Sequence, residues 1–154
     1  MATTITNATM TVTITESVSL NGSDQGGTNS FTVSNVDEVY KRILTCPASN
    51  TTTIATFNSD AHGAANAIDI EDSKYIRVTN KDNTNAVELA VVGAATLYQV
   101  TLAAGQSHIL GSADGLMLSE ADTSPSFGTM ADLGSIHVNP GGNAVDVEIF
   151  IASI

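Results

Sequence analysis

The 154-residue chain has no tryptophan, one cysteine and few charged or aromatic residues. Its three tyrosines and four phenylalanines leave little aromatic surface for stacking on bases or sugars. The lone Cys46 excludes an intrachain disulfide, and its place before Pro47, where a strand pattern ends, predicts a buried side chain rather than a reactive thiol. Because only 14% of the residues are charged, serine, threonine and asparagine supply the polar surface, as is common in secreted or particle-bound β-proteins.

Positive charge is especially scarce. The net charge is −11, and from Asp82 onward eight acids occur with no base. Such a surface repels phosphate backbones and anionic lipid, so we expect neither a nucleic acid nor a membrane surface as partner. The acidic balance instead favours either a basic protein partner or simple solubility. All five basic residues lie in the stretch from 41 to 81: Lys41, Arg42, Lys74, Arg77 and Lys81.

Long apolar runs are also missing. No segment approaches the length needed to span a bilayer, and the first residues, 1–6, have neither the basic region nor the apolar core of a secretory signal. We therefore expect a soluble protein that is made in the cytoplasm and leaves it only as part of a larger assembly. A chain of this length can bury one good hydrophobic core.

The most regular feature is a strict alternation over residues 9–20. Even positions there are apolar except for Glu16. A period of two places the two sets on opposite faces of an extended strand, one exposed to solvent and one buried. On this pattern we expect Val12, like Val147 near the C-terminus, to belong to the core, so that a charge at either position unfolds the domain. The odd positions are all hydroxyl residues: Thr9, Thr11, Thr13, Thr15, Ser17 and Ser19.

Further short strands are predicted along the whole chain, and no helix is favoured. The segment 36–46 is ambiguous, but its β-branched residues and the Cys-Pro ending favour a strand. Polar loops are predicted at 21–29 and 121–132. About ten short strands indicate an all-β, antiparallel two-sheet β-sandwich of jelly-roll or immunoglobulin-like type. The other predicted strands are 31–33, 51–57, 67–70, 75–79, 87–91, 98–102, 108–110, 136–138 and 145–151.

The strand at 9–20 is unusually long for a sandwich. At about 3.4 Å per residue it would span roughly 40 Å. Either it bends from one sheet to the other, or its beginning is an arm that pairs with a neighbouring subunit. We accordingly divide the chain into an N-terminal arm at residues 1–8 and a single β-sandwich domain at residues 9–154.

No catalytic signature is present. His62, His108 and His137 lack the close spacing of zinc sites, and no nucleophile elbow, phosphate loop or dinucleotide fingerprint occurs. Neighbouring acids such as Asp69 and Glu71 are more simply explained by a solvated turn than by paired catalytic carboxylates. We therefore expect neither enzymatic activity nor a cofactor.

Two acidic turns are the weak candidates for a metal site. Asp69 and Asp72 lie in the first, and Asp82 lies in the second. Calcium takes six to eight oxygen ligands, and neither segment has the spacing of a dedicated calcium loop. The alternative for both is a polar turn without a metal.

The middle of the chain resembles a known class of proteins. Residues 39–47, Val-Tyr-Lys-Arg-Ile-Leu-Thr-Cys-Pro, are followed by Tyr-Ile-Arg-Val-Thr-Asn-Lys-Asp at 75–82. Val-Glu-Leu at 87–89 and Leu-Ala-Ala-Gly-Gln-Ser-His-Ile-Leu at 102–110 come next. This order over residues 36–112 is similar to that of the small β-sandwich virion proteins of marine tailed phages. The resemblance brings no functional residues with it.

The resemblance implies a structural role in a virion, most simply as a capsid decoration or cement protein. The expected partners are further copies of the chain, in a trimer or another closed ring, and the major capsid or tail protein. The expected location is the virion, assembled in the host cytoplasm. The alternatives are a small tail or fibre component and a carbohydrate- or receptor-binding module, in which Tyr40 and Tyr75 would be the stacking platforms.

Overall fold

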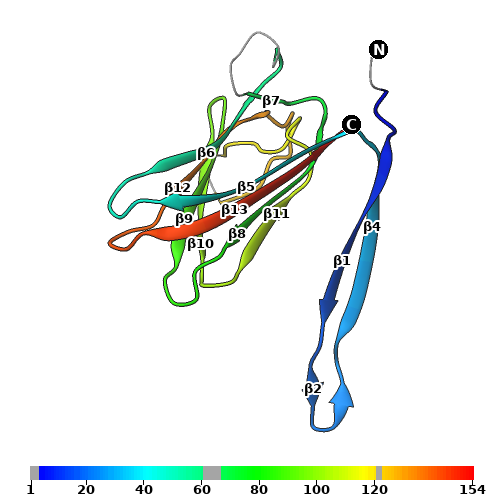
Figure 1. Cartoon of the computed structure of the whole chain (residues 1–154), viewed down its shortest axis with the longest axis vertical. Coiled ribbons are helices and arrows are strands. Elements are labelled where there is room, and N and C mark those ends of the chain that lie inside the picture. The colour runs from blue at the N-terminus through cyan, green and yellow to red at the C-terminus, as the bar shows by residue number, and fades with distance from the viewer. Residues whose placement is uncertain (1–3, 61–66, 121–122) are drawn as a thin grey trace.

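A computed structural model describes residues 4–60, 67–120 and 123–154. It contains strands and no helix in these ranges, so it has no helix that could cross a membrane there. The strands form two parts (Figure 1). Most of the chain builds two packed sheets, and the N-terminal quarter forms a long ribbon that projects beside them.

The ribbon is a β-hairpin whose strands are interrupted near the tip. We call residues 8–36 the arm. Its strands are β1 (Ala8–Glu16), β2 (Ser19–Leu20), β3 (Ser23–Asp24) and β4 (Gly27–Val36), paired β1 with β4 and β2 with β3.

The remaining strands form the sandwich. The four-stranded sheet has the order β11 (Ser107–Leu110), β8 (Ser73–Asn80), β13 (Val145–Ser153), β5 (Glu38–Cys46). The five-stranded sheet has the order β10 (Leu97–Leu102), β9 (Val87–Gly93), β12 (Leu133–Asn139), β6 (Thr52–Asn58), β7 (Ile68–Asp69).

The strand order is that of a jelly roll. Each connection from β5 to β6, β8 to β9, β10 to β11, β11 to β12 and β12 to β13 crosses from one sheet to the other. The long strands all pair in antiparallel fashion, and the parallel pair is formed by the two-residue β7 with β6. The predicted all-β antiparallel sandwich is confirmed. The ambiguous segment 36–46 is confirmed as a strand, because it supplies β5.

The core lies between the two sheets and is almost entirely aliphatic. Alternate residues of each strand point inward, as the period of two predicts. Cys46 ends β5 and is fully buried there, and burial raises the pKa of its thiol. The buried thiol prediction is therefore confirmed. The largest fully buried side chains are Ile76, Leu89, Leu133, Ile136, Ile149 and Ile151, joined by Val78, Val87, Val91, Val138, Val145 and Val147.

The last strand, β13, is one of the two inner strands of the four-stranded sheet. Over nine residues it pairs with β5 on one side, and over nearly its full length it pairs with β8 on the other. Five of its nine side chains are buried hydrophobic residues. The sheet therefore depends on a segment far in sequence from both of its neighbours.

One buried polar side chain holds together the loops at one end of the sandwich. The amide of Asn80 is fully buried at the end of β8. Its Nδ2 donates to the carbonyl oxygens of Asn85 at 2.8 Å and Leu102 at 3.1 Å. Its Oδ1 accepts from the backbone N–H of Asp82 at 3.0 Å. This one residue thus satisfies backbone groups on two separate loops, as buried polar groups require.

The arm differs from what the sequence predicts. The loop prediction for residues 21–29 is wrong: Asn21 and Gly22 form the two-residue turn at the tip, and β4 begins at Gly27. Both turn residues have positive φ, 52° and 78°, as in the type I′ turns that match strand twist. Residues 8–36 are paired with one another and belong to neither sandwich sheet.

The base of the arm rests on the outer face of the four-stranded sheet. Met10, Val12 and Val33 pack on a small second cluster of Val36, Tyr75, Ala152 and Phe150. The Tyr75 ring lies 6.1 Å from both the Phe31 and the Phe150 rings. The prediction that Val12 belongs to the main core is therefore wrong. One face of its strand is shielded from solvent because it packs on the outer face of the sandwich and not in the interior.

The hydroxyl face of the arm points away from this contact and is exposed. Thr13 and Ser30 share a hydrogen bond of 2.9 Å across the ribbon, and Thr15 and Thr28 share one of 3.3 Å. We expect Thr11→Asp, on this face, to change the free energy of unfolding by no more than about 0.5 kcal/mol, because the side chain stays in water. Urea titration followed by circular dichroism measures this, and a large loss of stability would mean that the hydroxyl face is covered.

Candidate functional site

The carboxylate of the metal candidate Asp82 is engaged in hydrogen bonds within its own turn. Its Oδ1 accepts the backbone N–H groups of Thr84 and Asn85, both at 2.7 Å, and the side-chain amide of Asn85 at 3.3 Å. These bonds, led by the one from the Asn85 backbone, lower the pKa of Asp82. The carboxylate has a clear structural task as an acceptor that closes the loop.

The candidates Asp69 and Asp72 line a small polar recess near the ends of β7 and β13. Asp37 and Glu38 line the same recess. Asp69 Oδ1 accepts the backbone N–H of Glu71 at 3.0 Å, which again caps a turn. Within residues 4–60, 67–120 and 123–154, no three His, Cys, Asp or Glu side chains are grouped so that they could hold a metal ion.

Two of the three histidines are hydrogen-bonded parts of the sandwich, one in each sheet, and His62 lies outside the described residues. His137, in β12, contacts the Thr53 hydroxyl at 3.0 Å and the Ser135 hydroxyl at 2.8 Å. His108, in β11, joins the Tyr98 hydroxyl at 3.0 Å through Nε2. Because β10 and β11 are edge strands of opposite sheets, this last pair links the two sheets at one margin.

The His108–Tyr98 pair predicts a pH effect. Burial lowers the pKa of His108, so the unfolded chain takes up a proton on this residue at a higher pH than the folded chain does. His108 therefore contributes stability that is full above the ordinary histidine pKa, about 6.5, and is lost as the pH falls through the lower folded pKa.

We expect the melting temperature to fall less between pH 7 and pH 5 in His108→Gln than in the unmodified protein. Scanning calorimetry at the two pH values measures this difference. Equal declines in both proteins would show that His108 does not sense pH in the fold.

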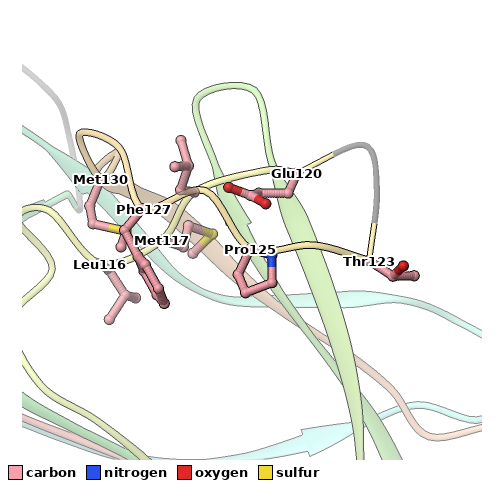
Figure 2. A pocket seen from close by; sticks show the side chains of 8 residues that line it. Leu116, Met117, Glu120, Thr123, Pro125, Phe127 and Met130 are labelled. Carbon is pink, nitrogen blue, oxygen red and sulfur yellow. The ribbon is translucent and has the colours of Figure 1, made fainter.

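A mainly apolar pocket is lined by the segment that connects β11 to β12 (Figure 2). It has a volume of about 440 Å³ and opens to solvent along one side. Phe127 on its wall is 87% exposed, and Glu120 at its rim accepts the backbone N–H of Ser126 through both carboxylate oxygens, at 2.7 and 2.9 Å. It holds no catalytic pair. Its lining is Leu116, Met117, Leu118, Glu120, Thr123, Pro125, Phe127 and Met130.

The tyrosines considered as sugar-stacking platforms are not free. Tyr75 is buried beneath the arm, between Phe31 and Phe150. Tyr40 packs partly against the main core. An exposed aromatic face of the kind that sugars stack on is therefore not offered by either residue.

The distal part of the arm is the most unusual surface of the molecule. Beyond the contact with the sandwich, Ile14, Val18 and Leu20 are exposed, Leu20 by 62%. Phe31 is 40% exposed even though it touches Tyr75. An isolated two-stranded hairpin is at best marginally stable in water, so a ribbon of this length with an open apolar side is a surface suited to a partner.

The outer face of the four-stranded sheet is the second surface with exposed apolar residues. On β5, Val39 is 53% and Ile43 is 57% exposed. Between them in the strand is Lys41, which lies 3.6 Å from Glu148. Glu148 also accepts a 2.7 Å hydrogen bond from Arg77, which is the main reason that its pKa is lowered.

Sequence reasoning found the apolar strand of the arm but missed the hairpin as a surface. The available signal was Asn21-Gly22, the strongest short-range hairpin dipeptide, between two segments rich in β-branched residues. The exposed hydrophobic residues of β5 gave no comparable signal, because their exposure follows from the edge position of that strand.

Neither the comparison with protein-family models nor that with curated proteins finds a match. Among solved structures, the chain is similar to one described by the words "Bacillus endospore appendages form a novel family of disulfide-linked pili". The two are 11% identical, with a TM-score of 0.44, and the alignment covers 76% of this chain and 86% of that chain. A likeness this distant assigns neither function nor partner.

Proposed function

We propose that this protein is a non-enzymatic structural component of a tailed-phage virion, and within that class a decoration protein bound to the outer shell. The observation that carries the structural role is the arm. Its distal apolar side chains are exposed in the single chain, and exposed apolar surface of this kind marks a site of protein contact.

Two other features support the same role. No three His, Cys, Asp or Glu side chains of the described residues are grouped so that they could hold a metal ion, and the lining of the apolar pocket has Glu120 as its one ionisable side chain. The sandwich is also a compact and densely paired unit, which suits a module repeated over a particle. The assignment to a phage virion comes from the resemblance of residues 36–112 to phage virion proteins.

The number of copies of this chain that co-sediment with purified virus particles, counted against the major shell protein, tests the role. We expect hundreds of copies per particle. A few dozen copies or fewer would move the protein to the tail or fibres, and none would overturn the virion role. Quantitative mass spectrometry of gradient-purified particles provides the count.

A further inference from the structure

We infer that the distal arm of one copy docks on the β5 margin of a second copy, the margin being defined by Val39, Lys41, Arg42 and Ile43. This inference deepens the proposed structural role, because it names the partner and the surface. The contact is heterologous: the arm of one subunit meets a different surface on the next.

The two surfaces match in apolar character. The arm offers Ile14, Val18 and Leu20, and the margin offers Val39 and Ile43, all exposed in the single chain. The base of the same arm already packs its apolar side on the outer face of this sheet, at Tyr75, Phe150 and Ala152. The register places these residues beside the margin: Ala152 is paired with Val39, and Phe150 with Lys41.

The two surfaces also match in charge. Residues 1–36 contain two acids, Glu16 and Asp24, and no lysine or arginine. The β5 margin carries Lys41 and Arg42 at adjacent positions, which point to opposite sides of the strand. Four of the five basic residues lie on β5 and β8. Because Lys41 and Arg77 already pair with Glu148, Arg42 is the β5 cation that has no ion pair among the described residues and can complement an acidic arm.

The backbone of β5 gives a third reason. Among the described strands, β5 pairs only with β13, so its other edge presents unpaired N–H and C=O groups over nine residues. The other edge strands of the sandwich are shorter: β10 has six residues, β11 four and β7 two. A strand of the incoming arm can therefore pair with β5 while its side chains cover the margin.

A mixing experiment with two variants tests the inference. Leu20→Asp disables the arm and Ile43→Asp disables the margin, and sedimentation velocity measures the oligomer size. We expect the unmodified protein to form oligomers and each variant alone to associate at least about tenfold more weakly, because an aspartate would be buried in the contact. An equimolar mixture of the two variants should form dimers and nothing larger, since one intact arm and one intact margin remain.

Matched controls separate this contact from general surface effects. Ser19→Asp alters the neighbouring arm residue, whose side chain points to the other face, and Leu97→Asp alters an equally exposed hydrophobic residue on β10. Both should assemble as the unmodified protein does. Charge reversal gives an independent test: Glu16→Lys and Arg42→Glu should each weaken association, and the double variant should recover it.

Three results would overturn the docking. The first is a protein that stays monomeric at every concentration, and the second is normal assembly of Ile43→Asp while Leu20→Asp fails, which would mean that arms contact arms. The third is a mixture that restores no dimer. None of these touches the proposed virion role, which the copy number on purified particles decides separately.

Discussion

Replacing Val147 with aspartate is expected to leave no folded sandwich. Val147 is fully buried at the centre of the four-stranded sheet, paired with Leu44 on β5 and with Asn80 on β8. A carboxylate there has no partner and no route to water. The cost is of order 5 kcal/mol, comparable with the whole stability of many domains, about 5–15 kcal/mol.

The same change at Val12 provides the matched comparison. Val12 is only partly buried, on the arm, and packs against the outside of the sandwich. We expect Val12→Asp to release the base of the arm while the sandwich stays folded. Two-dimensional NMR spectra of both variants distinguish the cases, because Val147→Asp should lose the dispersed signals and Val12→Asp should keep most of them. Complete unfolding of Val12→Asp would show that arm and sandwich fold as a single cooperative unit.

Asn80→Ala should be the next most damaging single change. Removing the amide leaves the carbonyl oxygens of Asn85 and Leu102 and the N–H of Asp82 without this partner. Each unsatisfied buried group costs about 1–3 kcal/mol, and partial entry of water reduces the sum. We expect a loss of about 3 kcal/mol, which for a protein of this size lowers the melting temperature by roughly 6–12 °C.

Asn143→Ala is the control for Asn80→Ala. Asn143 also donates through its side-chain amide to the same loop, to the Oδ1 of Asn85 at 3.2 Å, but this bond is exposed to solvent. Its loss should cost no more than about 0.5 kcal/mol. Calorimetric melting of the two variants tests the difference, and equal effects would contradict the role of Asn80 as the buried link between the loops.

The sandwich could be predicted from the sequence wherever one face of a strand meets the core. The alternation at 87–91 and 145–151, for example, predicts strands that the structure confirms as β9 and β13. The alternation at 9–20 likewise predicts a strand with one buried face, but it does not predict which part of the protein buries that face. Here the cover is the outside of the sandwich near Tyr75. Periodicity alone cannot make that distinction, because both kinds of burial exclude water in the same way.

The features that make up the candidate interaction surface were less accessible to sequence reasoning. The turn at Asn21-Gly22 has a recognisable signal, but its polar neighbours resemble a flexible loop. The β5 margin depends on which strands become edges, and this is a property of the complete topology. Likewise, Asn80 is an ordinary turn residue by composition. Its importance follows from two loops, at 85 and 102, that meet only in the folded protein.

The inner position of β13 also determines when the protein can fold during synthesis. Because β5 and β8 both pair with this strand, neither can complete its sheet until residue 153 has left the ribosome. Until then, the nascent chain exposes two apolar strands whose inner edges are unpaired, a condition that favours aggregation and engagement by chaperones. The strands of the arm pair locally, but its base also packs on Phe150 and Ala152 of β13. Ribosome stalling before the β13 codons should therefore yield chains whose sandwich is open and protease-sensitive and whose arm lacks its support.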